Sequence, residues 1–551
     1  MSLKVYTGLL VLRKPIKLRR TAETFTLGLL LEQTVKTHGN YDAIVSSHQN
    51  KKMTYSEVLD QVDRLAAGFL RIGYQIGDKV GLWAPNLIEW YIANLACARA
   101  GCVMVAINPA YQPKEIEYCI NKVGINAIIC GHKFKTQNYY EFLNSICPEL
   151  AQSDPGNLRS RSLPSLRSVV TIADEDLSGT HNYNEVLNMA NAELIHRIRS
   201  HQRDIKIDDP CNIQFTSGTT GMPKAAVISH FHLVNNGFFV GKRNELDKKH
   251  HKICVQVPLF HAFGTIITIS ASLNYGSTLV LPSAGFDPQR SLDVLKEERC
   301  TIIHGTPTMY VDLVNAQKER REKINAEIAI SGGALCSSYL FKEMINFLGL
   351  RKVKSVYGLS ETTAVVFQSL HDDDEYKSTC TVGYLQEHVE VKVVDKDNNI
   401  VPIGTAGELC VRAYGNMLGY WNDDEKTKEM IGADRWLKTG DQFILEENGY
   451  GRVVGRLKEM IIRGGENIFP KEIEDLLNTH PNIVETYVIG LQHERLGEEV
   501  CACIRIKENC TVTIEEIKKY CSGNIAHFKI PSVLKIVDGF PKTTSGKNSE
   551  V

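Results

Sequence analysis

A run of nine residues near the middle of the chain constrains its fold and its chemistry more than any other segment. The run comprises Thr216, Ser217, Gly218, Thr219, Thr220, Gly221, Met222, Pro223 and Lys224. The preceding residues 211–215 (CNIQF) are predicted to form a short strand, and the chain from Val227 onward is predicted to turn into a helix. Glycines let a backbone approach an anion, amide and hydroxyl groups donate hydrogen bonds to its oxygens, and a lysine offsets its charge. The run therefore predicts a phosphate-binding loop.

Two other interpretations of this run are less favourable. It is not a Walker A loop, because the G-x-x-x-x-G-K-[ST] spacing is absent. A flexible Ser/Thr/Gly linker is the other alternative, but such linkers do not usually end in Pro-Lys between two apolar runs.

Length, charge and hydropathy place the chain among large enzymes without a membrane span. It has 551 residues, of which 63 are basic and 64 acidic, so its charge gives no reason to expect nucleic acid or an anionic membrane as a partner. A bilayer helix needs about 20 mostly apolar residues. The longest charge-free stretch, residues 253–286, is interrupted by prolines and glycines. It is predicted to form a strand, a helix from Ile266 to Leu273 and a second strand. The oligomeric state has no signature in the sequence.

Fifteen cysteines are present, but none is paired as C-x-x-C and no Cys/His cluster has zinc spacing. We expect most of them to be buried, reduced thiols, which favours a reducing compartment. The acidic run HDDDE at residues 371–375 is predicted to be a solvated turn, since consecutive acids cannot all point at one ion.

Helix and strand signals alternate along the chain, which predicts an α/β fold with mixed or parallel sheets. One helix has a clear start, because Thr54 and Glu57 form a capping box. Apolar residues from Val58 to Leu70 then recur at a spacing of three to four and give this helix one apolar face. We expect a basic leader at residues 1–22, a large domain of mixed sheets flanked by helices at 23–455, and a small α+β domain at 456–551.

A series of motifs in the second half of the chain resembles those of the adenylate-forming enzymes. This family includes acyl-CoA synthetases, luciferases and peptide-synthetase adenylation domains. The motifs are TSGTTGMPK at 216–224, YGLSETT at 357–363, WLKTGD at 436–441, GRLKE at 455–459, RGGENI at 463–468 and PKTTSGK at 541–547. Stretches such as NPAYQ, HGTPTMYVD and HFKIP are most similar to a subfamily of medium-chain fatty acyl-CoA synthetases, acyl-CoA synthetase family member 2.

The resemblance implies an ATP-dependent fatty acyl-CoA ligase. A fatty acid and ATP would form an acyl-adenylate and pyrophosphate, and coenzyme A would then take the acyl group and release AMP. Both reactants in the first step are anions, so the site must supply cations, including Mg²⁺. The ligands implied are ATP, Mg²⁺, coenzyme A and a medium-chain fatty acid.

The resemblance also implies roles for individual residues. Lys224 and the hydroxyls of the loop would hold phosphates, Glu361 would ligate Mg²⁺, and Tyr357 would stack near the adenine. Ser360 stands where the family more often has threonine, and the hydroxyl is kept. Asp441 and Arg456 would hold the ribose, and Lys547 would bridge the carboxylate and the α-phosphate during adenylation. For Glu361, a carboxylate at a helix N-terminus is the alternative.

The small C-terminal domain would act as a mobile lid. Lys458 aligns with the family's hinge position, although an ordinary exposed lysine is the alternative. Gly464 and Gly465 would lie close to the pantetheine arm of coenzyme A. His261 would gate the acyl pocket, and a satisfied core histidine is an equally open interpretation. Residues implied to line the acyl pocket, where side-chain volume would set chain length, are Asn235, Gly305, Thr306 and Gly332.

Two further functions stay open at this point. The sequence continues for only four residues after Lys547, whereas members of the family usually continue through a further basic and apolar segment. An inactive paralogue that binds nucleotide or an acyl ligand is therefore one alternative. An adenylating enzyme that passes the acyl group to an acceptor other than coenzyme A is the other.

The first residues are basic and free of acids up to Glu23, which is typical of a mitochondrial transit segment. The segment is short of serine, and Pro15 would break a helix. The subfamily that the chain resembles is mitochondrial, so we expect a location in the mitochondrial matrix rather than the cytoplasm. The alternative is a cytosolic protein with a basic leading arm.

Overall fold

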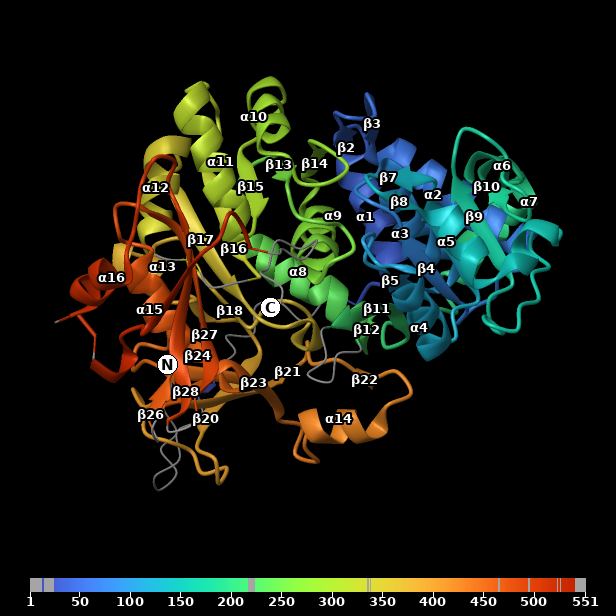
Figure 1. Ribbon diagram of the computed structural model, residues 1–551. Helices are drawn as coiled ribbons and strands as arrows, with labels where there is room; N and C mark the ends of the chain where they lie inside the picture. The colour runs from blue at the N-terminus through green and yellow to red at the C-terminus, as the bar shows by residue number, and fades with distance from the viewer. Residues whose placement is uncertain are drawn as a thin grey trace.

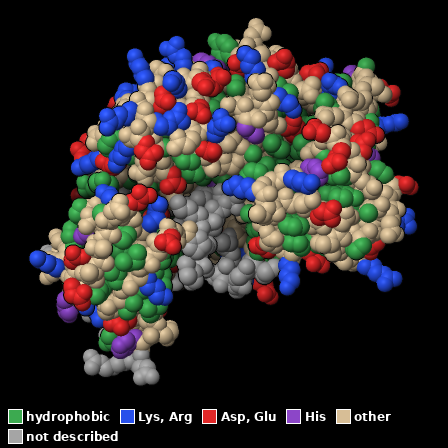
Figure 2. Space-filling view, turned by 45° about the horizontal axis from the view of Figure 1, so that its top comes forward, with side chains coloured by type: hydrophobic (Ala, Val, Ile, Leu, Met, Phe, Trp, Pro, Cys, Tyr) green, Lys and Arg blue, Asp and Glu red, His purple; other side chains and the backbone are tan. Residues whose placement is uncertain are grey.

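The computed structural model describes residues 12–13, 24–216, 223–333, 336, 338–463, 466–493, 496–522, 524–525 and 527–540. It confirms a mixed α/β fold with a large N-terminal part and a smaller C-terminal part, drawn in orange and red in Figure 1. Of the basic leader, only Leu12–Arg13 (β1) is described, and it pairs with Val389–Val394 (β20). Figure 2 shows basic and acidic side chains interspersed over the visible face, as expected from the balanced charge.

The first large sheet has eight strands and carries the predicted phosphate loop. Its strands, in spatial order, are β10 (His181–Asn182), β9 (Ser168–Ile172), β6 (Ala127–Gly131), β4 (Lys79–Trp83), β5 (Val103–Ala106), β11 (Pro210–Thr216), β12 (Lys224–Ser229) and β22 (Gly419–Tyr420). Neighbouring strands are parallel from β10 to β11, and the β11–β12 and β12–β22 pairs are antiparallel.

The second large sheet has nine strands, and most neighbours are parallel. Its strands, in spatial order, are β19 (Tyr384–Leu385), β18 (Phe367–Gln368), β17 (Lys352–Tyr357), β16 (Ile328–Gly332), β15 (Ile302–Gly305), β13 (Lys252–Val255), β14 (Thr278–Leu281), β2 (Asp42–Ser46) and β3 (Lys51–Thr54). The carboxyl ends of β15, β16 and β17 therefore lie side by side, which is where ligands bind in sheets of this kind.

Helices lie between the two large sheets and on their outer faces. The main hydrophobic core joins residues of both sheets to the helices between them. These are α1 (Leu27–His38), α2 (Tyr55–Arg71), α3 (Ile88–Ala100), α8 (His230–Arg243) and α9 (Ala271–Tyr275). Two further clusters cover the outer faces, with α4 (Pro113–Val123) and α5 (Tyr139–Ile146) on one sheet and α10 (Pro288–Glu297), α11 (Pro307–Arg320) and α12 (Ser338–Leu348) on the other.

The predicted capping-box helix is confirmed as α2. The Thr54 hydroxyl accepts a hydrogen bond from the Glu57 amide, and the Glu57 carboxylate accepts one from the Thr54 amide at 2.7 Å. The apolar face is buried at Val58, Val62 and Phe69. Hydroxyl and carboxylate thus satisfy donors that the first turn would otherwise leave open.

The charge-free stretch at 253–286 forms a strand, a helical segment and a strand, as predicted, but its helix begins as a π-helix at Phe263–Ser270. The expected turn at Val227 is wrong, because Val227 lies within β12 and the helix begins only at His230. Antiparallel pairing with β11 extends the strand to this point. In the part of the chain that the structure describes, no helix is long and apolar enough to cross a membrane.

A third sheet joins the large part to the small one. It consists of β1, β20, β21 (Gly407–Ala413), β23 (Leu437–Leu445) and β24 (Gly451–Arg456). A short 3-10 turn at Leu457–Glu459 follows β24. The small part has its own core, built by β25 (Ile461–Arg463), β26 (Glu466–Ile468), β27 (Ile483–His493), β28 (Gly497–Ile506), β29 (Val533–Ile536), α15 (Pro470–Leu477) and α16 (Ile514–Cys521).

The fifteen cysteines are free thiols and most are buried, as predicted. Burial raises the pKa of several of them, including Cys130 to about 12, so these thiols stay protonated at neutral pH. Cys501 and Cys503, both on β28, are among the buried ones. The cysteines therefore form no disulfide framework and contribute to the cores as small apolar side chains.

Candidate active site

The two ends of the predicted phosphate loop are held together by the strands that flank it. Thr216 ends β11, Lys224 begins β12, and the two residues are register partners in the antiparallel ladder. Tyr118 of α4 donates a hydrogen bond to the Pro223 carbonyl at 3.1 Å. The loop thus closes a hairpin at the edge of the eight-stranded sheet. Residues 217–222, from Ser217 to Met222, lie outside the described residues.

Glu361 lies at the end of this hairpin, on a 3-10 turn at Ser360–Thr362 that follows β17. Its Oε1 accepts hydrogen bonds from the Thr216 hydroxyl at 3.1 Å and from the Tyr420 hydroxyl at 2.8 Å. The side chain is only 7 % exposed. A charged, buried acceptor is thereby fixed between the two large sheets.

The backbone around this turn is held in an uncommon conformation. Thr363 and Ala364 have φ values of 53° and 71°, a region that few non-glycine residues adopt. The Thr363 hydroxyl donates to the Gly415 carbonyl at 2.6 Å and helps to hold it. A Cβ on Gly358 would lie 2.3 Å from the Ala364 carbonyl oxygen, so only glycine fits before the turn. The YGLSETT motif therefore has a steric reason for its glycine.

Tyr420 is a site residue that the sequence did not reveal. Its ring lies 4.7 Å from the Lys224 ammonium, and its hydroxyl donates to Glu361. It reaches this place because β22 pairs with β12 and sets Tyr420 opposite Ala226. A cation over an aromatic face and a carboxylate on its hydroxyl are both favourable contacts. Tyr420 therefore connects the lysine and the carboxylate of the predicted phosphate site.

A second group of predicted residues meets where β17 adjoins the third sheet. The Tyr357 hydroxyl donates to Asp441 Oδ2 at 2.6 Å, and Arg456 Nε lies 3.3 Å from Asp441 Oδ1. Asp441 and Arg456 are register partners on β23 and β24, and Asp441 is 3 % exposed. Burial raises the pKa of Tyr357 well above its usual range, and the neighbouring Asp441 carboxylate raises it further, so the phenol stays a donor.

Both groups line one cavity of about 2610 Å³ between the large and the small part. The predicted residues at its surface are Thr216, Pro223, Lys224, His261, Tyr357, Ser360, Glu361, Asp441 and Arg456. Residues from distant segments are thus brought together as one site. Its lining combines a lysine and hydroxyls with an aromatic ring and an aspartate–arginine pair.

His261 lies at the start of the π-helix and is partly exposed in this cavity. Its Nδ1 accepts a hydrogen bond from the Phe263 amide at 3.2 Å. Neighbouring Phe260, Ala262 and Phe263 line the same cavity. The place is compatible with a gate to an apolar pocket, and the role of His261 stays a prediction.

The other predicted residues are placed as follows. Lys458 lies in the 3-10 turn that leads into the small part. Gly464, Gly465 and Lys547 lie outside the described residues. Asn235 is buried in α8, Gly305 and Gly332 end adjacent strands, and Thr306 precedes α11, all beside the cavity rather than at its surface.

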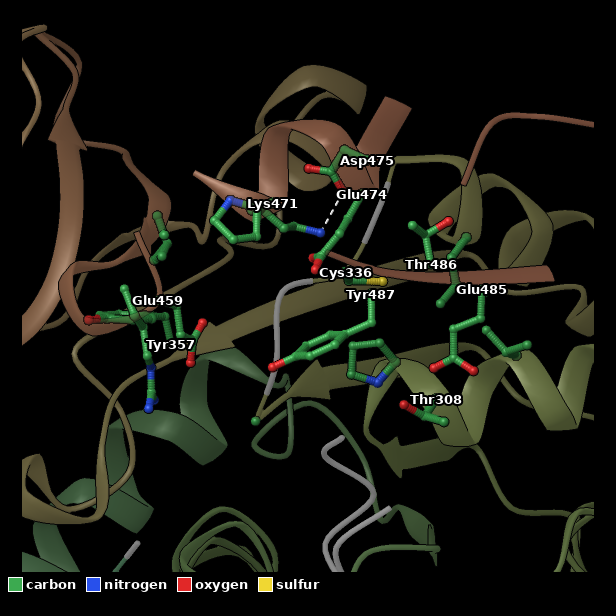
Figure 3. Close-up of a pocket in the computed structure, with 18 of the residues that line it drawn as sticks. Thr308, Cys336, Tyr357, Glu459, Lys471, Glu474, Asp475, Glu485, Thr486 and Tyr487 are labelled. Carbon is green, nitrogen blue, oxygen red and sulfur yellow. Dashed lines mark hydrogen bonds and ion pairs between the residues drawn. The ribbon is translucent and has the colours of Figure 1, made fainter. Parts of the chain in front are cut away.

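The small part contributes its own wall to the cavity. Figure 3 shows Lys471, Glu474 and Asp475 of α15 with Glu485, Thr486 and Tyr487 of β27, near Tyr357 and Thr308 of the large part. Lys471 forms an ion pair with Asp475 on the next turn of α15. The wall therefore carries charges of both signs.

Glu474 is expected to make stability depend on pH. Its Oε1 accepts a hydrogen bond from the Val488 amide at 2.9 Å, and burial raises its pKa to about 7. Because the folded pKa lies above the ordinary value of 4.5, the folded state loses stability as pH rises from about 5 through 7. We expect Glu474→Gln, which keeps the acceptor, to raise the Tm at pH 8 and to have little effect at pH 5. An equal effect at both pH values, measured by thermal unfolding, would contradict this.

Comparisons with known proteins agree with this geometry. Residues 31–421 match the family model of the AMP-binding enzymes, and residues 472–547 match that of their C-terminal domain. The medium-chain acyl-CoA ligase ACSF2, mitochondrial, of Danio rerio is 40 % identical over 528 residues, which cover 95 % of this chain and 87 % of that protein. The putative acyl-CoA synthetase YngI of Bacillus subtilis (strain 168) is 34 % identical over 524 residues, or 95 % of each chain.

A solved structure supports the same assignment. ATP-bound MatB from Rhodopseudomonas palustris is similar with a TM-score of 0.81 at 25 % identity, over 96 % of this chain and 97 % of that one. The match covers both the large and the small part. Together with the family models, it shows that the chain belongs to the AMP-binding enzyme family.

Proposed function

We propose that this protein ligates a medium-chain fatty acid to coenzyme A, with ATP converted to AMP and pyrophosphate. The observation that carries the proposal is that Lys224, Glu361, Tyr357 and Asp441 all line one cavity. The first pair suits phosphates and the second suits a nucleoside. The relative from Danio rerio is named a medium-chain acyl-CoA ligase, which supports the acyl substrate.

The chemistry explains why such a site is needed. A carboxylate does not acylate a thiol at neutral pH, because the leaving group would be oxide. Attack of a carboxylate oxygen on the α-phosphorus of ATP forms a mixed anhydride and expels pyrophosphate. The coenzyme A thiolate then attacks the carbonyl carbon and AMP leaves. The protein must therefore bring two anions together in the first step and admit a thiol in the second.

Lys224 and Glu361 would act on the phosphates. The Lys224 ammonium would offset their charge, and Glu361 would hold Mg²⁺. The site fits this ion, because both hydroxyl donors of the described residues fall on Oε1 and leave Oε2 for a cation. Mg²⁺ is usually bound by one or two carboxylates together with substrate phosphates. When bound, the ion would neutralise the charge that develops on the phosphates.

The described residues offer no competing metal site. No group of three or more His, Cys, Asp or Glu side chains that could hold a metal ion occurs among them. The described residues therefore form no metal site with several side-chain ligands. The arrangement we propose for Mg²⁺ is one carboxylate, that of Glu361, beside the phosphate loop.

Asp441 would orient the nucleoside. A carboxylate can accept hydrogen bonds from the two ribose hydroxyls, and Arg456 on the neighbouring strand forms an ion pair with it. The Tyr357 ring would stack near the adenine while its hydroxyl remains on Asp441. The α-phosphorus is thereby placed toward Glu361 and Lys224.

The small part would serve both half-reactions in turn. Lys547 would contact the carboxylate and the α-phosphate in the adenylation step, and Gly464 and Gly465 would let the pantetheine arm approach in the thioester step. Lys458, in the turn between the two parts, would be the hinge. His261 would close the acyl pocket while the adenylate forms.

We further propose a mitochondrial location, which is supported by the basic residues before Glu23 and by the printed name of the relative from Danio rerio. Residues 1–22 fused to a fluorescent protein should direct it to mitochondria, whereas a diffuse cytosolic signal would contradict the proposal.

The test of the proposed reaction is pyrophosphate release and acyl-CoA formation from ATP, Mg²⁺ and saturated acids of about four to sixteen carbons. We expect product that depends on coenzyme A and peaks at medium length. Pyrophosphate release without any thioester would favour transfer to another acceptor. Absence of pyrophosphate with every acid would favour the inactive, ligand-binding paralogue.

A further inference from the structure

Two buried polar side chains behind the cavity wall have hydrogen-bonding atoms that nothing satisfies among the described residues. They are Nε2 of His304 and Oγ1 of Thr306. His304 is 0 % exposed and Thr306 is 3 % exposed. A buried polar atom without a partner is destabilising, so such atoms call for a ligand or a water.

Both side chains lie on the inner face of the nine-stranded sheet. His304 is in β15, and Thr306 follows two residues later, so strand periodicity sets them on the same side. That side faces the main hydrophobic core, because Ile302, on the same side of β15, belongs to this core. Gly305 faces the other way, since a Cβ there would lie 3.1 Å from the Tyr310 ring.

The Thr306 hydroxyl is also unused as a helix cap. Thr306 is the N-cap residue of α11, and threonine at that position usually accepts a hydrogen bond from the first turn. Here it makes no such bond. The hydroxyl therefore does not bond to a backbone amide of the first turn of α11, and it can bond to a ligand instead.

The cavity wall lies directly in front of this pair. The Phe263 ring lines the cavity and lies 5.5 Å from the His304 ring. Pro307, next to Thr306, also lines the cavity. Both Phe263 and the Thr268 partner of His304 belong to the π-helix, a rare conformation that is frequent at functional sites. The polar pair thus lies next to residues that line the cavity.

The chemistry of the pair selects a neutral hydroxyl. Burial lowers the pKa of His304 to about 3, so the ring is neutral at physiological pH. Its Nδ1 shares a hydrogen bond of 2.8 Å with the Thr268 hydroxyl, and the tautomer decides whether Nε2 donates or accepts. A hydroxyl satisfies either tautomer. A second carboxylate would be a buried anion without a cation beside it, which is costly.

We propose that the acyl pocket ends at His304 and Thr306 and that the preferred substrates are medium-chain acids with a hydroxyl group at or near the far end. This inference rests on the proposed ligase function and specifies its substrate class. The hydroxyl would hydrogen-bond to His304 Nε2 and Thr306 Oγ1, while the chain packs against Phe263 and Ile267 of the π-helix. A saturated acid of the same length would leave both atoms unpaired.

The test compares kcat/KM for pyrophosphate release with ω-hydroxy acids and saturated acids of eight, ten and twelve carbons. We expect the hydroxy acid to be favoured by about 10-fold or more at the length that reaches the pair, since a polar site discriminates against an analogue that lacks the hydroxyl. Thr306→Val removes only the hydroxyl and should abolish most of this preference. Thr306→Ser keeps the hydroxyl and should retain it.

His304→Leu should likewise abolish most of the preference for the hydroxy acid. If this variant fails to fold, Thr306→Val still tests the inference. Equal kcat/KM for both acids in the wild type, or a preference unchanged in Thr306→Val, would overturn the inference and assign the two atoms to a bound water. That result would leave the ligase function intact, because the saturated acids would still react. Absence of pyrophosphate with either class of acid would instead remove the ligase function and this inference with it.

Discussion

Replacing Lys547 with alanine is expected to slow acyl-adenylate formation by on the order of 10²–10³-fold, the loss typical when one preorganised charge contact to a transition state is removed. The reacting carboxylate and the α-phosphate are both anionic, so an ammonium group between them stabilises the charge that develops as they meet. Lys547 lies in the motif PKTTSGK, outside the described residues. Thioester formation from supplied acyl-adenylate should be largely spared.

The two half-reactions are measured separately, by pyrophosphate release without coenzyme A and by acyl-CoA formation from synthetic adenylate. Gly465→Leu is the matched control, because a bulky side chain there should hinder the pantetheine arm and slow mainly the second reaction. Equal damage to both half-reactions in Lys547→Ala would contradict its role. The reverse order of damage in Gly465→Leu would remove this glycine from the thioester step.

The residues of the candidate site that meet at the cavity could be picked out from the sequence because they lie in short motifs at strand ends. TSGTTGMPK follows β11, YGLSETT follows β17, and WLKTGD begins β23. In each case a local pattern of glycine, hydroxyl and charge coincides with an apolar run that forms the strand. These strands belong to three different sheets, and residues from all three motifs line the one cavity.

Tyr420 could not be predicted in the same way. Its contacts with Glu361 and Lys224 depend on the pairing of β22 with β12, two strands that lie far apart in the sequence. No spacing within the local sequence encodes that pairing. The two-residue strand is also too short to show a periodic pattern.

The π-helix and the strand at Val227 were missed for a related reason. Apolar periodicity distinguishes a helix from a strand but not a π-helix from an α-helix over eight residues. Val227 lies in a continuous apolar run whose strand conformation is fixed by its ladder with β11. In both cases tertiary contacts decide a conformation that the local sequence leaves open.

Glu361→Gln is expected to lower pyrophosphate release by about 10²-fold or more, because the substitution removes the charge and keeps the shape. Glutamine Oε1 can still accept hydrogen bonds from Thr216 and Tyr420, so the turn should be preserved. What is lost is the anionic oxygen that we assign to Mg²⁺, and with it the neutralisation of charge on the phosphates.

Tyr420→Phe tests how much the orientation of the Glu361 carboxylate matters, because this variant keeps the charge that Glu361→Gln removes. The ring stays beside the Lys224 ammonium, and the hydroxyl is removed with its hydrogen bond to Glu361 Oε1 and its contact to the Met430 sulfur. We therefore expect a smaller loss, about 10-fold or less, together with a higher Mg²⁺ concentration for half-maximal rate. Titrations of pyrophosphate release with Mg²⁺ for the wild type and both variants measure the two effects. If Glu361→Gln kept the wild-type dependence on Mg²⁺, the ion would be held elsewhere, and Glu361 would serve only to fix the turn between β17 and the phosphate loop.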